Sequence, residues 1–546
     1  MGFDFLDFGF PKSGTDWKSI NGKPYITVSS KGRSNGLSTK INDGADFGPD
    51  TQLSLVLTNT SKTTGPPYSV SNGIMEAIAY AHYSGINTVV ILDGSFTINP
   101  ATYSIGSTNY ANYGLGIFDN MTILGQGIGK TTLNFVGSNF SDFIMPIEPG
   151  FSGSYCDIGN FTINAQNASQ GSVNNACMSN AFAQYSKYHD MQYLNFSGYG
   201  WNVGAGNATY YNHYERFIFN SSRNGQDALG GGFIHESTFR DIQFLQSNFD
   251  GLSLGMVYDS VFENIYATNC QSGGFTIDGG WVGNTINNII VDNAVNNSSA
   301  SDLTDGGIIL NDTLLNSLSE NNSFTNLISM NNKYGLGIYL NSSGYNTFKN
   351  IISYNNQNRG INIEASNLII DGMYLVDNNN TGMTYSGGNN NTISNVLIYD
   401  DLTTHVQTIG IYIYGPAGPF NNVLFSSFNI PNFAGLTSLG GQGSPLYVTI
   451  KDSYIPGMSF STPAIPASGT ALQNENVIIP IKIYLYGGTV TQIQLTKNGT
   501  AYTVFSNASG LALSGQSYIL NPGDSITLTY TSAPTWLWLP DDTNIL

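Results

Sequence analysis

The sequence predicts an all-β solenoid, in which the chain winds into stacked coils of short strands. A motif of the form apolar–x–Asn–apolar returns at intervals of about 22 to 35 residues, a spacing typical of repeat architectures. Each copy alternates apolar and polar residues without helical spacing, and a glycine and a second short alternating segment follow it. The copies are STFRDIQF (237–244), SVFENIYA (260–267), NTINNIIV (284–291), NSFTNLIS (322–329), NTFKNIIS (346–353) and NTISNVLI (391–398).

Asparagine occupies two fixed positions of this repeat. A tight bend between strands needs a residue in the left-handed conformation, which Asn tolerates better than other residues that carry a side chain. Amides stacked one coil apart, at ~4.8 Å, hydrogen-bond along the column. The first column contains Asp241, Asn264, Asn288, Asn326, Asn350 and Asn395, and the second contains Asn269, Asn293, Asn331, Asn355, Asp377 and Asp400. We interpret both columns as structural ladders.

Three N-terminal segments extend the pattern: INDGADFGPDT (41–51), SNGIMEAIAYAHYSGINTVVILDGSFTI (71–98) and NMTILGQGIGKTTLNF (120–135). With the repeat, they resemble the right-handed parallel β-helix of the pectate-lyase-like superfamily over residues 41–430. The resemblance implies a right-handed single-stranded parallel β-helix (solenoid) with an N-terminal capping helix over its open end. Lyases, hydrolases, isomerases and adhesins all use this scaffold, so the resemblance implies a fold and leaves the activity open.

The capping helix and the ends of the chain can be placed by composition. Ser71 is the expected N-cap of the helix, and Met75, Ile78 and Ala79 give it an apolar face. Residues 1–40 are expected to form an arm or anchor, and residues 41–440 the β-helix domain. Residues 445–546 contain segments that are typical of hairpin-linked antiparallel strands and predict a C-terminal β-sandwich domain. Residues 457–473 are interpreted as a linker.

Composition excludes several classes of protein. Only 10% of the residues are charged and the net charge is −18, so a groove for nucleic acid is not expected. No apolar run is long enough to span a membrane, and the first residues lack the features of a signal peptide. Many Asn-x-Ser/Thr sequons suggest an extracellular, glycosylated surface. The three cysteines form no CxxC pair; a Cys156–Cys177 disulfide and buried free thiols both remain open.

Known motifs of catalysis and cofactor binding are missing or incomplete. GQGIGKTT (125–132) leaves three residues between Gly125 and Gly129, where a phosphate-binding loop has four. Pectin hydrolases of the resembled fold carry a Gly-His-Gly that is absent here. Its pectate lyases use aspartate clusters with an Arg or Lys base, and the repeat is poor in both cations. We expect no metal and no cofactor.

One group of acids is the first candidate for catalysis. Asp377 and Asp400 stand on neighbouring coils, Asp401 is beside them, and His405 follows four residues later. Carboxylates that gather without a nearby cation raise one another's pKa, as a general acid requires. The alternative is that aspartate only replaces asparagine at the end of the ladder.

A second acidic pair, Glu236 and Asp259, also occupies one column on neighbouring coils. The charges beside this pair alternate in sign, so solvated ion pairs between coils are the alternative interpretation. Asp278 and Glu364 share another column, but three coils separate them by about 14 Å, beyond the range of glycosidase carboxylates. Four aromatic residues are candidates for stacking against sugars: Trp201, Tyr210, Tyr211 and Trp281.

The preferred hypothesis is a virion surface spike, a host-attachment protein that recognises a cell-surface polysaccharide or glycoprotein. The expected partners also include other virion proteins through the N-terminal arm, and further copies of the chain in a homo-oligomer. The composition resembles that of surface proteins of archaeal viruses from acidic environments, so an acid-stable extracellular protein is expected. The alternatives are a secreted polysaccharide lyase or glycoside hydrolase, and a cellular surface-layer or adhesion protein.

Overall fold

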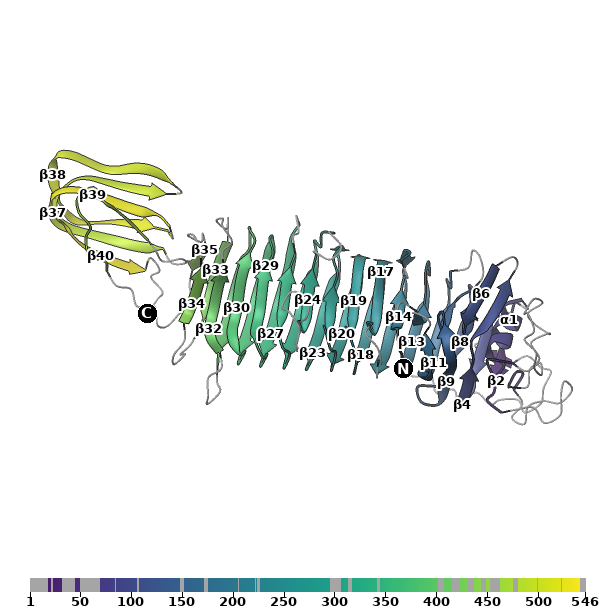
Figure 1. Cartoon of the computed structure of the whole chain (residues 1–546). Helices are drawn as coiled ribbons and strands as arrows, with labels where there is room; N and C mark the ends of the chain where they lie inside the picture. The colour runs from purple at the N-terminus through teal and green to yellow at the C-terminus, as the bar shows by residue number, and fades with distance from the viewer. Residues whose placement is uncertain are drawn as a thin grey trace. The chain divides into compact units, whose positions relative to one another are not determined.

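The structure, a computed structural model, describes only part of the chain. The described residues are 18–20, 23–31, 45–49, 69–83, 85–105, 108–147, 152–170, 175–204, 206–220, 222, 226–294, 306–312, 317–340, 344–400, 407–414, 423–430, 437–442, 448–451, 462–474, 480–497, 499–521 and 523–540. The chain divides into two compact units, Met1–Ile309 with Leu314–Ser317, and Leu310–Thr313 with Leu318–Leu546. Both units contain parallel coils, whose strands lie side by side in Figure 1.

The longer strands of the first unit pair in parallel and form its sheet 1. Val261 pairs with Thr238 of the preceding coil and with Thr285 of the next, so the coils repeat after 23 and 24 residues. The strands are β2 (Lys23–Val28), β3 (Thr88–Ile91), β4 (Gly94–Ile98), β8 (Thr122–Leu124), β9 (Thr131–Phe140), β11 (Asp157–Gln170), β13 (Lys187–Leu194), β16 (His213–Asn220), β18 (Thr238–Phe244), β20 (Val261–Thr268) and β23 (Thr285–Asp292).

A second parallel set of strands, sheet 2 of the first unit, completes each coil. Its strands are β7 (Leu115–Ile117), β10 (Ile144–Pro146), β12 (Ala176–Ser179), β14 (Tyr199–Val203), β15 (Thr209–Tyr210), β17 (Leu229–His235), β19 (Leu252–Tyr258), β21 (Phe275–Ile277) and β22 (Trp281–Val282). The division between the units falls within β24 (Ile308–Asn311). A hairpin, β5 (Ala101–Ile105) and β6 (Thr108–Tyr113), pairs antiparallel.

The second unit repeats the same arrangement. Its sheet 1 consists of β25 (Ser323–Met330), β27 (Asn346–Tyr354), β29 (Leu368–Val376), β31 (Thr392–Tyr399), β33 (Val423–Asn429) and β35 (Val448–Lys451). Its sheet 2 consists of β26 (Leu336–Tyr339), β28 (Arg359–Glu364), β30 (Asn380–Gly387), β32 (Gln407–Tyr414) and β34 (Thr437–Gln442). The motifs NTFKNIIS and NTISNVLI both pair in parallel with β29, which lies between them. The predicted parallel β-helix is confirmed.

The N-terminal end differs from the prediction in one respect. Strand β1 (Lys18–Ile20) pairs antiparallel with β2, but β2 itself pairs in parallel with β3 and so belongs to sheet 1. The parallel sheet therefore begins before residue 41, inside the segment expected to form a separate arm. A strand of six residues that reads PYITV after its first lysine has the β-branched composition of a buried strand, which the sequence interpretation overlooked.

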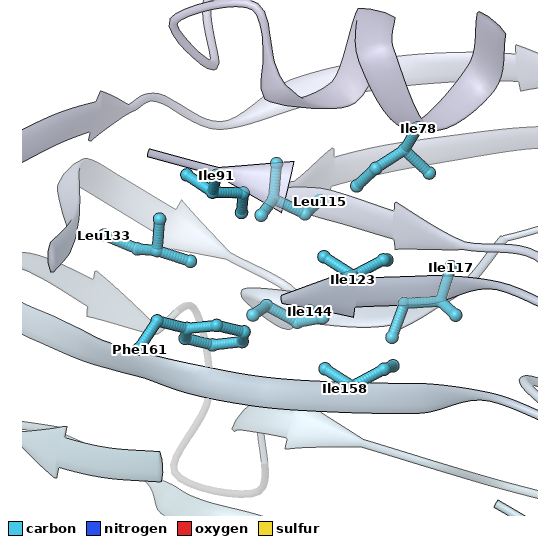
Figure 2. A pocket seen from close by; sticks show the side chains of 9 residues that line it. All are labelled: Ile78, Ile91, Leu115, Ile117, Ile123, Leu133, Ile144, Ile158 and Phe161. Carbon is cyan, nitrogen blue, oxygen red and sulfur yellow. The ribbon is translucent and has the colours of Figure 1, made fainter. Parts of the chain in front are cut away.

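The capping helix is present as α1 (Ile74–Tyr83) and packs against β2, β3 and β7. Ser71 caps the helix through its side chain, whose Oγ accepts from Met75 N at 3.0 Å. The N-cap position itself belongs to Gly73, because Asn72 and Gly73 have φ of 52° and 85° and the Gly73 carbonyl accepts the first helical bond from Ala77 N at 3.0 Å. Figure 2 shows a small gap beneath the helix. It is lined only by the apolar side chains of Ile78, Ile91, Leu115, Ile117, Ile123, Leu133, Ile144, Ile158 and Phe161, and we interpret it as imperfect core packing.

The first asparagine ladder is confirmed, and the second is confirmed from Asn269 to Asp377: Asn293 Nδ2 donates to Asn269 Oδ1 at 2.8 Å and Asn355 Nδ2 to Asn331 Oδ1 at 2.7 Å, whereas Asp400 does not adopt a positive φ. Asn264 and Asn288 adopt φ of 58° and 59°, and Asn288 Nδ2 donates to Asn264 Oδ1 at 2.8 Å. Asn350 Nδ2 donates to Asn326 Oδ1 at 3.1 Å in the same way. The column is interrupted by Gly372, which takes the left-handed position between the coils of Asn350 and Asn395. The bend therefore requires a residue that tolerates a positive φ. Where asparagine fills this position in neighbouring coils, the side-chain amides lie one above the other and hydrogen-bond.

The C-terminal strands form one antiparallel sheet with a bent central hairpin. They are β36 (Ala471–Gln473), β37 (Ile481–Lys497), β38 (Thr500–Leu520), β39 (Ser525–Ser532) and β40 (Thr535–Pro540). The first half of β37 pairs with β38 and β40, and the second half pairs with β38 and β39. Gly487 and Gly488, at φ of 63° and 68°, form the bend. Side chains from both halves, such as Ile483 and Ile493, are buried, as expected of a small sandwich.

Candidate functional site

One corner of the first unit holds bulky residues in a conformation that such residues rarely adopt. The corner lies between the end of each sheet 2 strand and the start of the next sheet 1 strand. In five consecutive coils its left-handed position is occupied by Tyr155, Tyr185, Tyr211, Glu236 and Asp259, at φ of 58°, 53°, 58°, 48° and 49°. Each backbone N–H donates to the following coil, for example Tyr185 N to Tyr210 O at 3.1 Å. We call these five residues the corner column.

The three tyrosines of the corner column form an exposed stack. The ring centroids of Tyr155 and Tyr185 are 5.4 Å apart, and those of Tyr185 and Tyr211 are 4.8 Å apart, with the rings nearly parallel. The residues are 59%, 51% and 40% exposed. A left-handed conformation costs about 1–2 kcal/mol for a residue with a side chain, and strain of this kind concentrates at functional positions. The stack is therefore the first candidate for a binding surface.

A second aromatic column runs directly beside the first. His235 stacks between Tyr210 and Tyr258, with centroid separations of 4.6 Å on both sides. These three residues end strands β15, β17 and β19, so sheet 2 sets their spacing. The corner thus presents two parallel aromatic columns across neighbouring coils, which we call the aromatic corner.

Behind the aromatic corner, a buried ladder of small polar side chains fixes the backbone. From Tyr185 onward, each corner residue is followed by a serine or asparagine whose side-chain oxygen accepts the N–H of the equivalent residue one coil earlier; Tyr155 is followed by Cys156, whose N–H donates to Ser186 Oγ at 3.0 Å. Four such bonds of 2.8–3.1 Å connect Ser186, Asn212, Ser237, Ser260 and Asn284. All five are at most 2% exposed. Satisfied buried networks of this kind are rigid, so the aromatic corner is held in place from within.

Electrostatics at the corner favours uncharged or cationic partners. Glu236 and Asp259 are exposed and continue the column beyond Tyr211. A hydrogen bond to Glu236 raises the pKa of Tyr211. Burial lowers the pKa of His235, although Glu236 and Asp259 act in the opposite direction. The phenol of Tyr211 and the imidazole of His235 are therefore neutral near pH 7, and the residues that continue the column carry carboxyl groups.

The arrangement of the rings decides what they can contact. Because neighbouring rings cover each other's faces, the corner exposes mainly ring edges and hydroxyl groups, repeated at the coil spacing. Tyrosine combines an apolar body with a hydroxyl at little entropic cost, which suits partners that carry both C–H faces and hydroxyl groups. A linear polysaccharide repeats such groups along an extended chain.

Two of the four aromatic residues proposed for sugar stacking are not available. Trp201 and Trp281 are fully buried. Trp201 Nε1 donates to Asn180 Oδ1 at 3.0 Å, and Trp281 Nε1 donates to Leu254 O at 2.8 Å. Both indoles fill the interior of the coils, so their assignment as sugar-stacking residues is corrected to core packing. Tyr210 and Tyr211 remain candidates as part of the aromatic corner.

Two of the first acidic candidates, Asp377 and Asp400, are buried within the coils. Asp377 takes the left-handed ladder position at φ of 53°, and its side chain is 1% exposed. Asp400, 6% exposed, accepts a hydrogen bond from Gln407 N at 2.9 Å through Oδ2. Asp401 and His405 lie outside the described residues. Burial and a backbone donor favour a role for Asp400 in closing the ladder, and a catalytic role for the group stays a prediction.

A different acidic cluster is present in the first unit. Asp227 and Asp250 occupy equivalent positions on neighbouring coils, where Ala228 N donates to Asp250 O at 3.0 Å. Asp278 accepts from Ser253 Oγ, and Asp250 accepts from Gly273 N. Burial raises the pKa of Asp250 to about 7 and, with the charges of Asp250 and Asp278, holds that of Asp227 well above its usual range.

The cluster is covered by an aromatic ring. A Cβ placed on Gly230 would lie 2.5 Å from the Tyr199 ring and 3.0 Å from Asp227 Oδ2, so both groups converge on this glycine. Burial, together with Asp227 and Asp278, raises the pKa of Tyr199 to about 12. Asp227 Oδ1 is buried and accepts no hydrogen bond. Such a cluster retains protons near neutral pH, which is the property of a general acid.

Sequence reasoning missed both the polar ladder and the acidic cluster, although each has a signal. The dipeptides Tyr-Ser, Tyr-Asn, Glu-Ser, Asp-Ser and Gly-Asn begin at residues 185, 211, 236, 259 and 283, two residues before each sheet 1 strand. Asp227 and Asp250 stand two residues before the sheet 2 strands of their coils. The sequence places Asp278 in one column with Glu364, but in the structure the acidic side chains near Asp278 are those of Asp227 and Asp250.

Three further findings concern the described residues. Within them, no group of three or more His, Cys, Asp or Glu side chains is arranged to hold a metal ion. No helix among them is long and apolar enough to cross a membrane. Cys156, Cys177 and Cys270 are buried free thiols, so the open question of a Cys156–Cys177 disulfide is decided in favour of free thiols.

Comparison with known proteins identified structures of similar fold but no family. No family model and no curated protein matches the sequence. A mannuronan C-5 epimerase module (AlgE6) of Azotobacter vinelandii matches with 15% identity and a TM-score of 0.45, over 70% of this chain and 93% of the module. Gene product 12 of bacteriophage phi29 matches with 16% identity and a TM-score of 0.49, over 72% of this chain and 56% of that one. A GH87 α-1,3-glucanase of Streptomyces thermodiastaticus matches with 14% identity and a TM-score of 0.37, over 71% of this chain and 70% of the glucanase chain. At these values the function must be argued from the chain itself.

Proposed function

We propose that this protein is an extracellular attachment protein that binds a cell-surface glycan along the aromatic corner of its first unit. The observation that supports the proposal is the stack of Tyr155, Tyr185 and Tyr211, which are exposed and held in the left-handed conformation. A chain selected for stability alone would have Asn or Gly at these positions, as the asparagine ladders do. Strain that is retained at an exposed and rigid surface points to binding.

The charge of the corner narrows the class of glycan. Glu236 and Asp259 would repel uronate or sulfate groups, whereas neutral sugars offer hydroxyl groups to both the carboxylates and the phenols. The proposed ligand is therefore a neutral polysaccharide or the neutral part of a glycoprotein glycan. A virion spike used for host attachment is the form of this protein that we favour, since a rigid solenoid with few surface charges suits an exposed fibre in an acidic medium.

Affinity electrophoresis tests the glycan proposal. The purified chain is run through native gels that contain a neutral polysaccharide, a uronate-rich polysaccharide or none. The neutral gel should retard the wild type, and the triple variant Tyr155→Asn, Tyr185→Asn, Tyr211→Asn should lose at least tenfold in apparent affinity. The control replaces two tyrosines of the C-terminal sheet, Tyr486 and Tyr502, which are 45% and 52% exposed, by Asn. Equal retardation of the triple variant and the control would contradict the proposal.

The setting of the protein needs a separate experiment. Immunogold labelling of a culture of the source organism distinguishes virions from cell envelopes. Gold on virus particles supports the spike, whereas gold confined to cell surfaces supports the alternative of a surface-layer or adhesion protein.

A second candidate function is a polysaccharide lyase or glycoside hydrolase, favoured by the cluster of Asp227, Asp250 and Asp278. Its raised pKa values would supply a protonated carboxyl for the glycosidic oxygen and an ionised one to activate water. Reducing-end release from host polysaccharide, lost in Asp278→Asn, would support this function. Absence of release, with glycan binding intact, would leave attachment as the function.

A further inference from the structure

A second row of strained side chains lies beside the corner column in the first unit. Three residues before three of the corner residues, the chain passes another bend at which the backbone is left-handed. Phe182, Phe233 and Met256 occupy this bend, at φ of 64°, 60° and 53°. Phe182 and Phe233 are 55% and 39% exposed. We call these three residues the apolar row.

The fold does not require an apolar residue at this bend. The register of the sheet 2 strands places Phe233, Met256 and Gly280 at equivalent positions of consecutive coils, and Gly280 adopts φ of 72° there. Glycine makes the bend without strain, whereas phenylalanine and methionine make it at a cost in stability. Bulky residues that are kept in a strained and exposed position point to a function of their side chains.

The rings of the apolar row are open to a ligand. The tyrosines of the corner column stack on one another and expose mainly their edges. By contrast, no aromatic ring among the described residues stacks on Phe182 or Phe233. An open aromatic face or thioether offers an apolar contact and no strong hydrogen bond, so its matching partner is a C–H face or a methyl group.

Two neighbouring coils combine the apolar row with hydrogen-bonding groups in one strip of surface. In the first of these coils the outward residues are Phe233, His235 and Glu236, with the buried Ile234 between them. Three residues of extended chain span about 10 Å, which is wide enough for one sugar ring with its substituents. The next coil repeats the same order of an apolar, an aromatic and a carboxyl-bearing residue: Met256, Tyr258 and Asp259.

We propose that this strip recognises the acetamido group of an N-acetylhexosamine in the glycan, an inference that rests on the proposed function. An acetamido group carries a methyl group, a carbonyl oxygen and an N–H donor in one substituent. Phe233 or Met256 contacts the methyl group. The Tyr258 hydroxyl donates to the carbonyl oxygen, and a carboxyl oxygen of Glu236 or Asp259 accepts the N–H. The sugar is uncharged, as the proposed function requires.

Other substituents at the same carbon fit the strip less well. A hydroxyl group would lie beside the apolar row, where it loses hydrogen bonds to water and finds no partner. A free amino group would be attracted to the carboxyl groups but would bring no methyl group to the apolar row. The apolar row therefore determines specificity, whereas the corner column binds the chain of sugars.

Isothermal titration calorimetry of the full chain with three tetrasaccharides tests the inference. Tetra-N-acetylchitotetraose, cellotetraose and chitotetraose share one linkage and differ only at C2, which carries an acetamido, a hydroxyl or an amino group. The wild type should bind the acetamido form at least fivefold more tightly than either of the others. In Phe233→Asn with Met256→Asn, which suits both left-handed bends, this preference should fall below twofold while the affinity for cellotetraose is retained. The control, Val504→Asn with Leu511→Asn, changes residues of the C-terminal sheet that are 43% and 44% exposed, and it should behave like the wild type.

Three results would overturn the inference: equal affinity of the wild type for the three tetrasaccharides or binding of none, tighter binding of the amino form than of the acetamido form, and a preference that the double variant retains. The preference of the wild type by itself keeps the test decisive if the double variant fails to fold. Failure of the proposed function is a separate result, because it appears as equal retardation of the tyrosine triple variant and its control in polysaccharide gels.

Discussion

Asn378 Oδ1 accepts two hydrogen bonds from Asn356, one from Nδ2 at 2.9 Å and one from the backbone N at 3.2 Å. Asn332 N donates in the same way to Asn356 Oδ1 at 3.0 Å. All three side chains are at most 1% exposed. A ladder of buried amides therefore runs through the second unit, one residue after the second column of asparagines that the sequence identified. Buried donors and acceptors that satisfy each other are expensive to disturb.

The ladder of Asn356 is buried, whereas the ladder of Asn350 is exposed, and this difference predicts that substitutions in the two ladders change stability by different amounts. Asn356→Ala removes the acceptor of Asn332 N and the bonds that Asn356 Nδ2 donates to Asn378 Oδ1 and Ser329 O in the interior, so the free energy of unfolding should fall by about 2–4 kcal/mol. The matched change on the exposed ladder, Asn350→Gly, keeps the left-handed bend and should cost less than about 1 kcal/mol. Urea denaturation of both variants measures the difference. Equal losses would contradict the view that burial, rather than ladder membership, sets the cost.

Tyr185→Asn tests whether the aromatic corner is strained. Asparagine relieves about 1–2 kcal/mol of backbone strain and loses two ring contacts of about 0.5–1.5 kcal/mol each. The free energy of unfolding should therefore stay within about 1 kcal/mol of the wild type while glycan retention falls. A core tyrosine of similar size, Tyr193, is fully buried, and Tyr193→Asn should cost several kcal/mol. A large loss of stability in Tyr185→Asn would show that the stack is a structural element.

His189 should stabilise the fold most strongly in mild acid. Its Nε2 lies 2.9 Å from Asp157 Oδ1 and its Nδ1 lies 2.7 Å from Asp190 Oδ2. Burial opposes the charge, but the bonds to both carboxylates raise the pKa of His189 overall. The stabilisation is therefore complete below the unfolded pKa of about 6.5 and is lost as the pH rises through the folded pKa.

The measurement compares His189→Gln with the exposed control His213→Gln at pH 5.5 and pH 8.5. Burial raises the pKa of Asp190, but hydrogen bonds from Arg216 and His189 outweigh it and hold this pKa below its usual range, so Asp190 remains ionised at pH 5.5. His189→Gln should lower the melting temperature more at pH 5.5 than at pH 8.5, and His213→Gln should change it little at either. A larger effect of His189→Gln at pH 8.5 than at pH 5.5 would show that the pKa of His189 is lowered in the folded protein rather than raised.

The acidic cluster should make the first unit less stable as the pH rises. The folded pKa of Asp250 is about 7, above an unfolded value of about 4, so the folded state binds more protons between these values. Asp250 alone should contribute about 2–3 kcal/mol of lost stability between pH 5 and pH 8, and the raised pKa values of Asp142 and Asp227 add to the loss of the wild type. In Asp250→Asn, which still offers an oxygen to Gly273 N, this dependence should be reduced. The exposed control Asp241→Asn should keep it, and an identical slope in Asp250→Asn would exclude the cluster as its source.

The same titration continued to pH 2 tests the expected acid stability. Amide ladders and apolar cores do not titrate, and the buried carboxyl groups of Asp142 and Asp250, whose pKa values burial raises to about 7, are already protonated there. Near-UV circular dichroism should remain native to about pH 3. A cooperative transition centred near pH 4 would show that ionised carboxylates hold the fold together.

The sequence by itself determined the coil. Local rules were sufficient. The alternation of apolar and polar residues defines the strands, and the return of the motif after one coil defines how the strands stack. Asn264 and Asn350, at their bends, indicate a left-handed backbone. Ser71 and the apolar face after it defined the capping helix for the same reason. These features depend on residues close together in sequence, so the chain shows them without knowledge of its neighbours in space.

Only the tertiary structure decided which side chains face outward and which meet. Trp281 follows Gly279 and Gly280, whose φ of 100° and 72° break the alternation and place the indole in the core. Asp227, Asp250 and Asp278 come from successive coils and meet because the register of the sheet 2 strands aligns them. The stacking of Tyr185 with Tyr211 needs the same register. A shift of one residue between coils reverses the face of every side chain, and this register is set by packing over the whole coil rather than by any local pattern.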